Sequence, residues 1–123
     1  MKKIMMVDDE QDQLLTLKTI FNNSDKKYEL ITANSGMQCL QLLKNEEIPD
    51  LIFMDIMMPE MTGWELLNRI KENPRWKNIP IVFLTAKGDE MSIGMGGLAS
   101  EEYIVKPFNI VELKEKVERI LTK

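Results

Sequence analysis

Short apolar runs alternate with longer amphipathic stretches from one end of the chain to the other. Most of the runs are continuously apolar, as expected for strands that are covered on both faces, whereas a strand with one wet face alternates apolar and polar residues. The pattern therefore predicts a buried parallel β-sheet. We expect its strands at Lys3–Val7, Tyr28–Ala33, Leu51–Met54, Pro80–Thr85 and Tyr103–Val105.

The stretches between these runs repeat apolar residues at helical spacing. Leu14, Leu17 and Phe21 share one face of the first stretch, and Leu113 and Val117 share one face of the last. Three stretches begin with Ser, Thr or Asn followed three residues later by Glu or Gln, which is typical of a helix N-terminus. We expect helices at Asp9–Asn23, Ser35–Asn45, Thr62–Glu72, Asp89–Leu98 and Asn109–Leu121.

The regular alternation of strand and helix predicts an α/β domain in which helices cover both faces of the sheet. The chain has 123 residues, which suits one domain with its own core. It contains no repeat, low-complexity segment or Pro/Ser-rich linker. We therefore expect a single domain over residues 1–123, with no output domain attached.

Composition narrows the possible functions. A net charge of −4 gives no general attraction to nucleic acid or anionic lipid, and no apolar run is long enough to span a bilayer. The single cysteine, Cys39, cannot form an internal disulfide, so we expect a cytoplasmic protein in which Cys39 packs as a small hydrophobe. The chain has no histidine. Its chemistry must therefore rest on carboxylates, hydroxyls and lysine.

Several polar residues stand where the expected strands end. Asp8 and Asp9 follow the first strand, Asp55 follows the third, Thr85 ends the fourth and Lys106 follows the fifth. In an open parallel sheet, ligands bind at the carboxyl ends of the strands. With a strand order of 2-1-3-4-5, these side chains would converge on one edge of the sheet.

The convergence of three carboxylates predicts a metal ion and a phosphoryl-transfer site. Each pair repels by about 4 kcal/mol at 4 Å and an effective dielectric constant near 20, and Mg²⁺ relieves such repulsion with carboxylate, water and phosphate oxygens. Asp55 would then attack phosphorus, Lys106 would pair with one phosphoryl oxygen, and the Thr85 hydroxyl with the Ala86 N–H would hold another.

Four motifs surround these residues in the chain. They are Val7-Asp8-Asp9-Glu10, Asp55-Ile56-Met57-Met58-Pro59-Glu60-Met61-Thr62-Gly63, Leu84-Thr85-Ala86 and Tyr103-Ile104-Val105-Lys106-Pro107-Phe108. In this order they resemble the receiver domain of two-component response regulators, free-standing CheY-like proteins included. The likeness covers the whole chain, and it implies a flavodoxin-like (βα)5 three-layer sandwich with a five-stranded parallel sheet of order 2-1-3-4-5.

The resemblance also assigns roles to individual residues. It implies that Asp55 is the phosphoacceptor, that Asp9 holds Mg²⁺ directly, and that Asp8 helps through water. The backbone carbonyl of Met57 would be a further metal ligand. Lys106 would complete the site.

The resemblance further implies a conformational switch. The Thr85 hydroxyl would move toward the phosphate and the Tyr103 ring would turn inward behind it, while the peptide before Pro107 would be cis. Output would leave through the face formed by the fourth helix, fifth strand and fifth helix. Because Gly94-Met95-Gly96-Gly97 falls inside the expected fourth helix, we expect that helix to be short or labile.

The expected partners follow from the same resemblance. The phosphoryl donor would be a phosphohistidine on a sensor kinase or a histidine phosphotransfer protein, and the target would be a protein that the sequence does not identify. We expect a monomer or a phosphorylation-dependent dimer. The chain would be a switch that catalyses only its own phosphorylation and dephosphorylation, not a turnover enzyme.

Two other functions fit the same fold class. A flavodoxin-type flavin module would need a hydroxyl- and glycine-rich loop after the first strand, but Asp8-Asp9-Glu10 would repel the flavin phosphate. An aspartyl-phosphate hydrolase would place a second acid two residues after its nucleophile, where Met57 stands. Asp8, Asp9 and Glu10 could by themselves be an acidic first helical turn that complements the helix dipole. That interpretation does not explain why the carboxylate of Asp55 stands at the end of an apolar strand, where it would be costly if unpaired.

Overall fold

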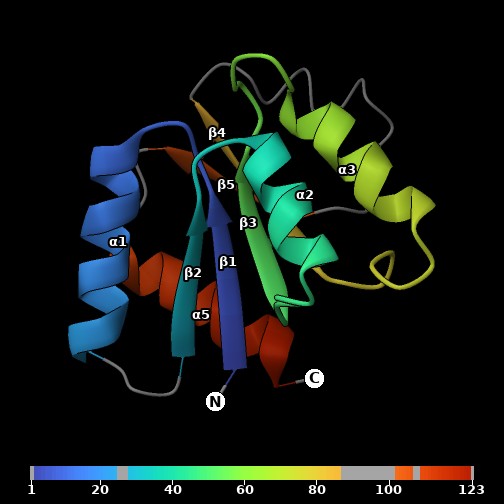
Figure 1. The fold of residues 1–123 in the computed structure, drawn as a ribbon. Helices are drawn as coiled ribbons and strands as arrows, with labels where there is room; N and C mark the ends of the chain where they lie inside the picture. The colour runs from blue at the N-terminus through green and yellow to red at the C-terminus, as the bar shows by residue number, and fades with distance from the viewer. Residues whose placement is uncertain (1, 25–27, 87–101, 107–108, 123) are drawn as a thin grey trace.

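The computed structural model describes residues 2–24, 28–86, 102–106 and 109–122, which form a five-stranded parallel sheet flanked by four helices (Figure 1). The strand order is β2-β1-β3-β4-β5, as expected from the sequence. The strands are β1 (Lys2–Val7), β2 (Tyr28–Ala33), β3 (Leu51–Asp55), β4 (Ile81–Ala86) and β5 (Glu102–Lys106). The described helices are α1 (Gln11–Ser24), α2 (Gly36–Lys44), α3 (Gly63–Glu72) and α5 (Ile110–Leu121).

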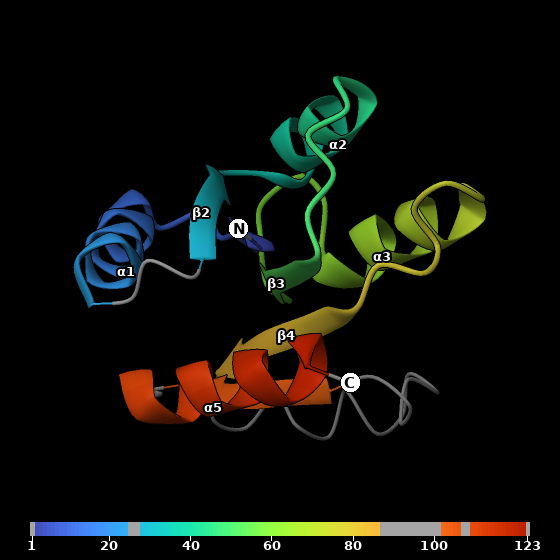
Figure 2. The same ribbon diagram turned by 90° about the horizontal axis from the view of Figure 1, so that it is seen from below.

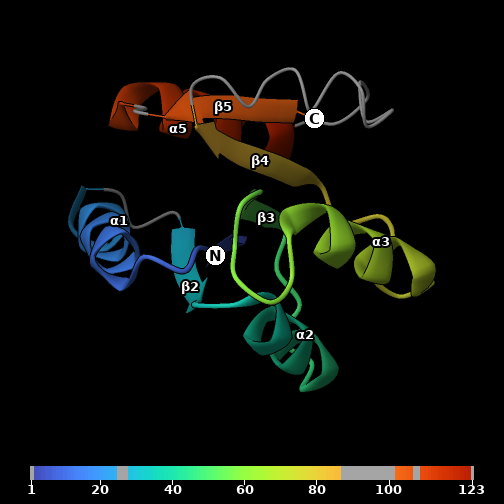
Figure 3. The same cartoon turned by 90° about the horizontal axis from the view of Figure 1, so that it is seen from above.

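The helices form two layers around the sheet. Figures 2 and 3, which look along the strands from below and from above, place α1 and α5 on one side of the sheet and α2 and α3 on the other. Each side has its own hydrophobic cluster. The expected three-layer sandwich is therefore confirmed for the described part of the chain.

The strands supply both clusters by alternation. In β1, Ile4 and Met6 pack on the α1/α5 side, while Met5 and Val7 pack on the α2/α3 side. Successive side chains of a strand point to opposite faces, so a strand buried on both faces must be apolar at every position. This explains the continuous apolar runs, in which each fully buried side chain contributes about 1.5–3 kcal/mol.

The expected helix caps are present. The Thr62 hydroxyl accepts from the Glu65 N–H at 3.2 Å, and the Glu65 side chain accepts from the Thr62 N–H at 3.3 Å, which completes a capping box. The side-chain oxygens of Ser35 and Asn109 cap α2 and α5, where they accept from the Gln38 N–H and the Glu112 N–H. The three helix starts therefore follow from local sequence.

The first helix begins two residues later than the sequence predicts. Asp8 Oδ1 accepts from the Glu10 N–H at 3.0 Å, and the Glu10 carbonyl accepts the first helical hydrogen bond, from Leu14, at 3.1 Å. The Asp8 side chain thus holds a turn in which Asp9 lies outside the helix. The acidic pair belongs to the β1–α1 connection.

Strands β3 and β5 extend further than their apolar cores. Asp55 pairs with Leu84 across the sheet, and Lys106 pairs with Ala86. The apolar pattern ends before these charged residues, although the backbone ladder continues through them. The expected fourth helix, Asp89–Leu98, and the peptide before Pro107 lie outside the described residues.

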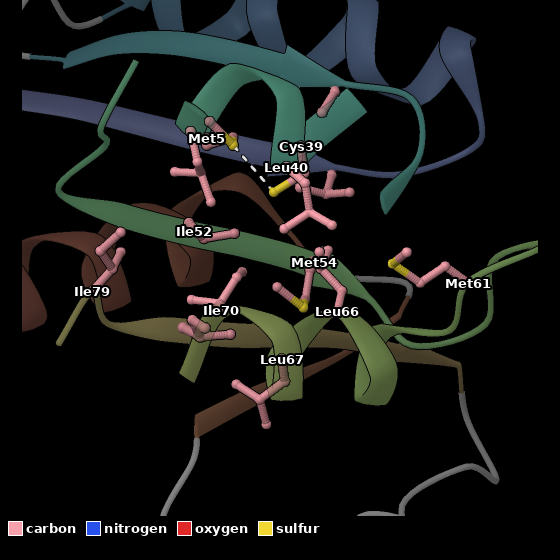
Figure 4. Close-up of a cluster of buried hydrophobic side chains, with 14 of the residues drawn as sticks. Met5, Cys39, Leu40, Ile52, Met54, Met61, Leu66, Leu67, Ile70 and Ile79 are labelled. Carbon is pink, nitrogen blue, oxygen red and sulfur yellow. Dashed lines mark hydrogen bonds between the residues drawn. The ribbon is translucent and has the colours of Figure 1, made fainter. Parts of the chain in front are cut away.

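The α2/α3 cluster contains Cys39, whose side chain points toward Met5 (Figure 4), and also Trp76. Cys39 is fully buried, as expected, its thiol lies 3.6 Å from Met5 Sδ, and burial raises its pKa to about 12. Trp76 is also buried, but its Nε1–H has no hydrogen-bond partner within the described residues. Leaving such a donor unpaired costs roughly 1–3 kcal/mol.

The start of α3 is pressed against the end of β3. The Gly63 N–H donates to the Ile56 carbonyl at 2.8 Å. A Cβ atom added at Gly63 would lie 2.5 Å from the Asp55 carbonyl oxygen and 2.9 Å from Ile56 Cα, both of which are backbone atoms. Only glycine fits here without moving the strand that carries Asp55.

No described helix is both long enough and apolar enough to cross a membrane.

We expect Gly63→Ala to lower the free energy of unfolding by about 1–3 kcal/mol, the usual cost of overpacking, in urea denaturation. Gly36→Ala is the matched control, because Gly36 is also the first residue of a capped helix. The three atoms nearest its added Cβ all belong to the flexible Met61 side chain rather than to backbone. Equal losses in the two variants would contradict the proposed backbone clash.

Candidate functional site

Three carboxylates meet at the carboxyl edge of the sheet. Asp8 directly follows β1 and is fully buried, Asp55 is the last residue of β3 and is 8% exposed, and Asp9 is exposed. One oxygen from each lies within 4.8 Å of the others. Hard oxygen donors at this spacing suit Mg²⁺, which commonly uses one or two carboxylates and keeps several waters. The group could hold a metal ion.

Lys106 joins the two buried carboxylates. Its Nζ lies 3.3 Å from Asp8 Oδ2 and 3.3 Å from Asp55 Oδ2. Lys106 reaches them because it is the last residue of β5 and pairs with the end of β4. The β1–α1 connection, β3 and β5 thus each contribute one charged side chain to the same contact.

Burial and charge act in opposite directions on Asp55. Desolvation raises the pKa of its carboxyl group most strongly, and the neighbouring charge of Asp8 raises it further. Lys106 and a hydrogen bond from the Met57 backbone N–H counteract this, but the pKa of Asp55 remains above its ordinary value.

Burial and charge also act in opposite directions on the pKa of Lys106. Burial alone would lower the pKa of its ammonium group, but the charges of Asp55 and Asp8 outweigh burial and leave the pKa raised. Lys106 is therefore charged at neutral pH. It stabilises both carboxylates in their ionised form.

Backbone contacts fix Asp8 in place. Its N–H donates to the Ala33 carbonyl at 3.1 Å, and its Oδ1 accepts from the Glu10 N–H. Its other carboxylate oxygen, Oδ2, accepts from Lys106 Nζ. Both carboxylate oxygens of Asp8 therefore already have protein partners. Asp9, which is exposed, is better placed to meet a solvent-borne ligand directly.

The remaining expected site residues surround this group in different ways. Thr85 is fully buried near the end of β4, one residue before Ala86. The Met57 side chain is 65% exposed, and its backbone N–H bonds Asp55 rather than solvent. Tyr103 pairs with Phe83 across the sheet, and 42% of it is exposed, so the inward position expected in the switched state is not the one observed.

Sequence reasoning missed the part of the loop after Asp55 that shapes the site. Glu60 has a φ of 68°, and the Met61 N–H donates to the Pro59 carbonyl at 2.7 Å, which closes a three-residue γ-turn. That turn brings Gly63 back against the end of β3. The sequence does show that a glycine, Gly63, directly follows the Thr62 helix cap. It does not show that a larger residue there would clash with the backbone at the end of β3.

Comparison with known proteins identifies the family. The family model described as the response regulator receiver domain matches residues 4–118. The polar-differentiation response regulator DivK of Brucella ovis is 35% identical over 123 residues, which are 98% of this chain and 96% of DivK. A probable cyclic di-GMP phosphodiesterase of Vibrio cholerae is 36% identical over 93% of this chain.

The chain spans only part of some relatives. It covers 25% of the Vibrio protein and 48% of the transcriptional regulatory protein PhoP of Bacillus subtilis, but nearly all of DivK. Among solved structures, the response regulator TrrA of Thermotoga maritima, in complex with Mg²⁺-BeF, is 36% identical with a TM-score of 0.81 over 98% of this chain and 99% of TrrA. The chain therefore belongs to the response regulator receiver domains of two-component systems.

Proposed function

We propose that this domain is a phosphorylation switch in which Asp55 accepts a phosphoryl group with the help of Mg²⁺. The observation that carries the proposal is the contact of Lys106 with both Asp55 and Asp8. It joins a nucleophile, a cation and a group of metal-binding oxygens at one edge of the sheet. A receiver domain with this arrangement has the parts that phosphoryl transfer needs.

The chemical step uses the chain's own side chains. An Asp55 carboxylate oxygen forms a bond to phosphorus while the bond from phosphorus to the donor breaks, and the electron pair of that bond leaves with the donor. Lys106 turns its charge from the carboxylates to a phosphoryl oxygen, and the Thr85 hydroxyl with the Ala86 N–H binds another. Attack of water on phosphorus later regenerates Asp55. Catalysis is thus positioning and charge neutralisation.

Mg²⁺ is the proposed cofactor. Asp9, Asp55 and the Met57 carbonyl would hold it directly, with Asp8 acting through water because both Asp8 oxygens already have partners. When bound, the ion would neutralise the negative charge that collects as the phosphoryl group arrives. The Mg²⁺-BeF complex of TrrA supports this assignment.

The proposed donor is a phosphohistidine on a sensor histidine kinase or a histidine phosphotransfer protein, in the cytoplasm. The position two residues after Asp55 favours a switch over a hydrolase, because an exposed Met57 cannot act as the acid or base of rapid turnover. The domain would therefore act as a signal carrier.

The proposed output surface includes β5 and α5. Tyr103 and Val111 are exposed there, by 42% and 61%, and apolar groups of this size on a surface suit a protein partner. Inward rotation of the Tyr103 ring would change this surface when Thr85 moves toward the phosphate. The partner could be a target protein or, on phosphorylation, a second copy.

Acetyl phosphate with Mg²⁺ should add one phosphoryl group to the wild type, detected by intact mass. Asp55→Asn should abolish the adduct because it removes the nucleophile. Asp12→Asn is the matched control, since Asp12 is an exposed carboxylate in the first turn of α1 but lies outside the acidic group. An adduct that persists in Asp55→Asn, or forms without a divalent ion, would refute the mechanism.

Asp9→Asn should weaken Mg²⁺ binding by at least about tenfold in isothermal titration calorimetry, because even an indirect partner of a metal site often accounts for a factor of 10–100. Asp12→Asn should bind Mg²⁺ as the wild type does. If Asp9→Asn and Asp12→Asn bound the ion equally well, Asp9 would not be a ligand.

The raised pKa of Asp55 predicts a pH-dependent stability in EDTA. Because the native protein holds this proton more tightly than the unfolded chain, stability is lost as the pH rises from the ordinary value of 3.8 through the raised pKa. Asp55→Asn should therefore raise the free energy of unfolding at pH 7 by roughly 0.5–3 kcal/mol.

The gain should shrink as the pH falls, and vanish below 3.8, where the wild-type carboxyl group becomes protonated in both states. Urea denaturation of both proteins across this range measures the difference. A gain that is the same at every pH would show that charge is not its cause.

A further inference from the structure

The methionines of this chain differ widely in exposure. Among those that the structure describes, Met37 and Met57 are exposed, by 52% and 65%. The others are each 7% exposed or less, and Figure 4 shows three of them inside the α2/α3 cluster. A dissolved oxidant attacks a thioether only where it can reach the sulfur, so Met37 and Met57 should react first. The buried ones are Met5, Met6, Met54, Met58 and Met61.

Met57 lies beside the proposed phosphoacceptor. Its backbone N–H donates a hydrogen bond to the Asp55 carboxylate. With ordinary bond lengths, this contact places the Met57 Cα within about 5 Å of a carboxylate oxygen. Ile56 and Met58 are both buried in the α2/α3 cluster, so the loop is anchored on either side of Met57. The exposed Met57 side chain therefore starts from a fixed point next to Asp55.

Oxidation is tolerated at Met57 but not at its buried neighbours. A methionine sulfoxide carries a polar oxygen in place of the lone pair of an apolar thioether. Burying such an acceptor without a donor would cost roughly 1–3 kcal/mol, which would disturb the core at Met54 or Met58. At Met57, water solvates the new oxygen and the fold is left unchanged.

We propose that Met57 is a site of oxidation by hydroperoxides, and that its sulfoxide shortens the lifetime of a phosphoryl group on Asp55. The Met57 sulfur attacks one oxygen of the peroxide and forms a sulfur–oxygen bond while the O–O bond breaks. The departing oxygen takes up the proton and leaves as water when the oxidant is hydrogen peroxide. Sulfur is oxidised and the peroxide is reduced.

The sulfoxide changes how water meets the phosphoryl group. A thioether sulfur is a weak acceptor, whereas a sulfoxide oxygen holds a water molecule by a hydrogen bond. Water is the reactant that removes the phosphoryl group, so holding it beside Asp55 should speed that step. This effect rests on the proposed function, since it needs a phosphoryl group on Asp55. The oxidation of Met57 does not.

Peptide mass spectrometry after brief treatment with dilute hydrogen peroxide tests the site. We expect Met57 to gain one oxygen at least about tenfold faster than Met54 and Met58, because exposure governs the reaction. Met37 is the internal reference, since it is exposed on α2 and should react at a rate similar to that of Met57.

The phosphoryl lifetime tests the consequence. Each protein is phosphorylated with acetyl phosphate and Mg²⁺, before or after oxidation, and loss of the adduct is followed by intact mass. In Met37→Leu, which keeps Met57, oxidation should shorten the half-life by about threefold or more, a small part of what a positioned acid or base gives. In Met57→Leu, which keeps Met37, oxidation should leave the half-life of that variant unchanged. This comparison also controls for every other methionine.

Two results would overturn the proposal. One is a Met57 that reacts no faster than the buried methionines. The other is a half-life that oxidation alters equally in Met37→Leu and Met57→Leu, or in neither. A wild type that takes up no phosphoryl group even before oxidation would instead refute the proposed function, and with it the effect on lifetime, while the peptide masses still decide whether Met57 is the oxidation site.

Discussion

The contact of Lys106 with Asp8 and Asp55 is the interaction on which the site depends. Asp8 is fully buried and Asp55 nearly so, and an isolated buried carboxylate would be costly. The ammonium group lies 3.3 Å from each, although it is 98 residues from Asp8 and 51 from Asp55 in the chain. It can do so only when β1, β3 and β5 lie in their observed order. Assembly of the sheet and assembly of the site are therefore one event.

Much of this arrangement follows from the sequence because its causes are local. The apolar runs fix the strands, and the caps at Ser35, Thr62 and Asn109 fix three helix starts. Once the strands are parallel, the carboxyl-edge rule brings Asp55 and Lys106 together without knowledge of any distance. The membership of the site could thus be predicted, although the role of each member in phosphoryl transfer remains a proposal.

The features that sequence reasoning missed have two causes, a local side-chain turn and contacts between distant elements. The α1 boundary moved because the Asp8 side chain caps a turn, so one residue serves both the site and the fold. Gly63 is required by the backbone at the end of β3, and Trp76, which follows α3, is buried in the α2/α3 cluster with its Nε1 unpaired. The exposed Tyr103 ring differs for another reason, since a switch has two states and sequence does not specify which one is observed.

The two ends of the domain use charge in opposite ways. At the carboxyl edge, the ammonium group of Lys106 pairs with two buried carboxylates, Asp8 and Asp55. At the other end, Glu46 adopts a φ of 67° just after α2 and holds Arg75 at 2.7 and 2.8 Å. Arg75 lowers the pKa of the Glu46 carboxyl group, so this pair persists at neutral pH. Because both side chains are exposed, its main effect is geometric. It ties the residue just after α2 to the segment between α3 and β4, which also contains Trp76.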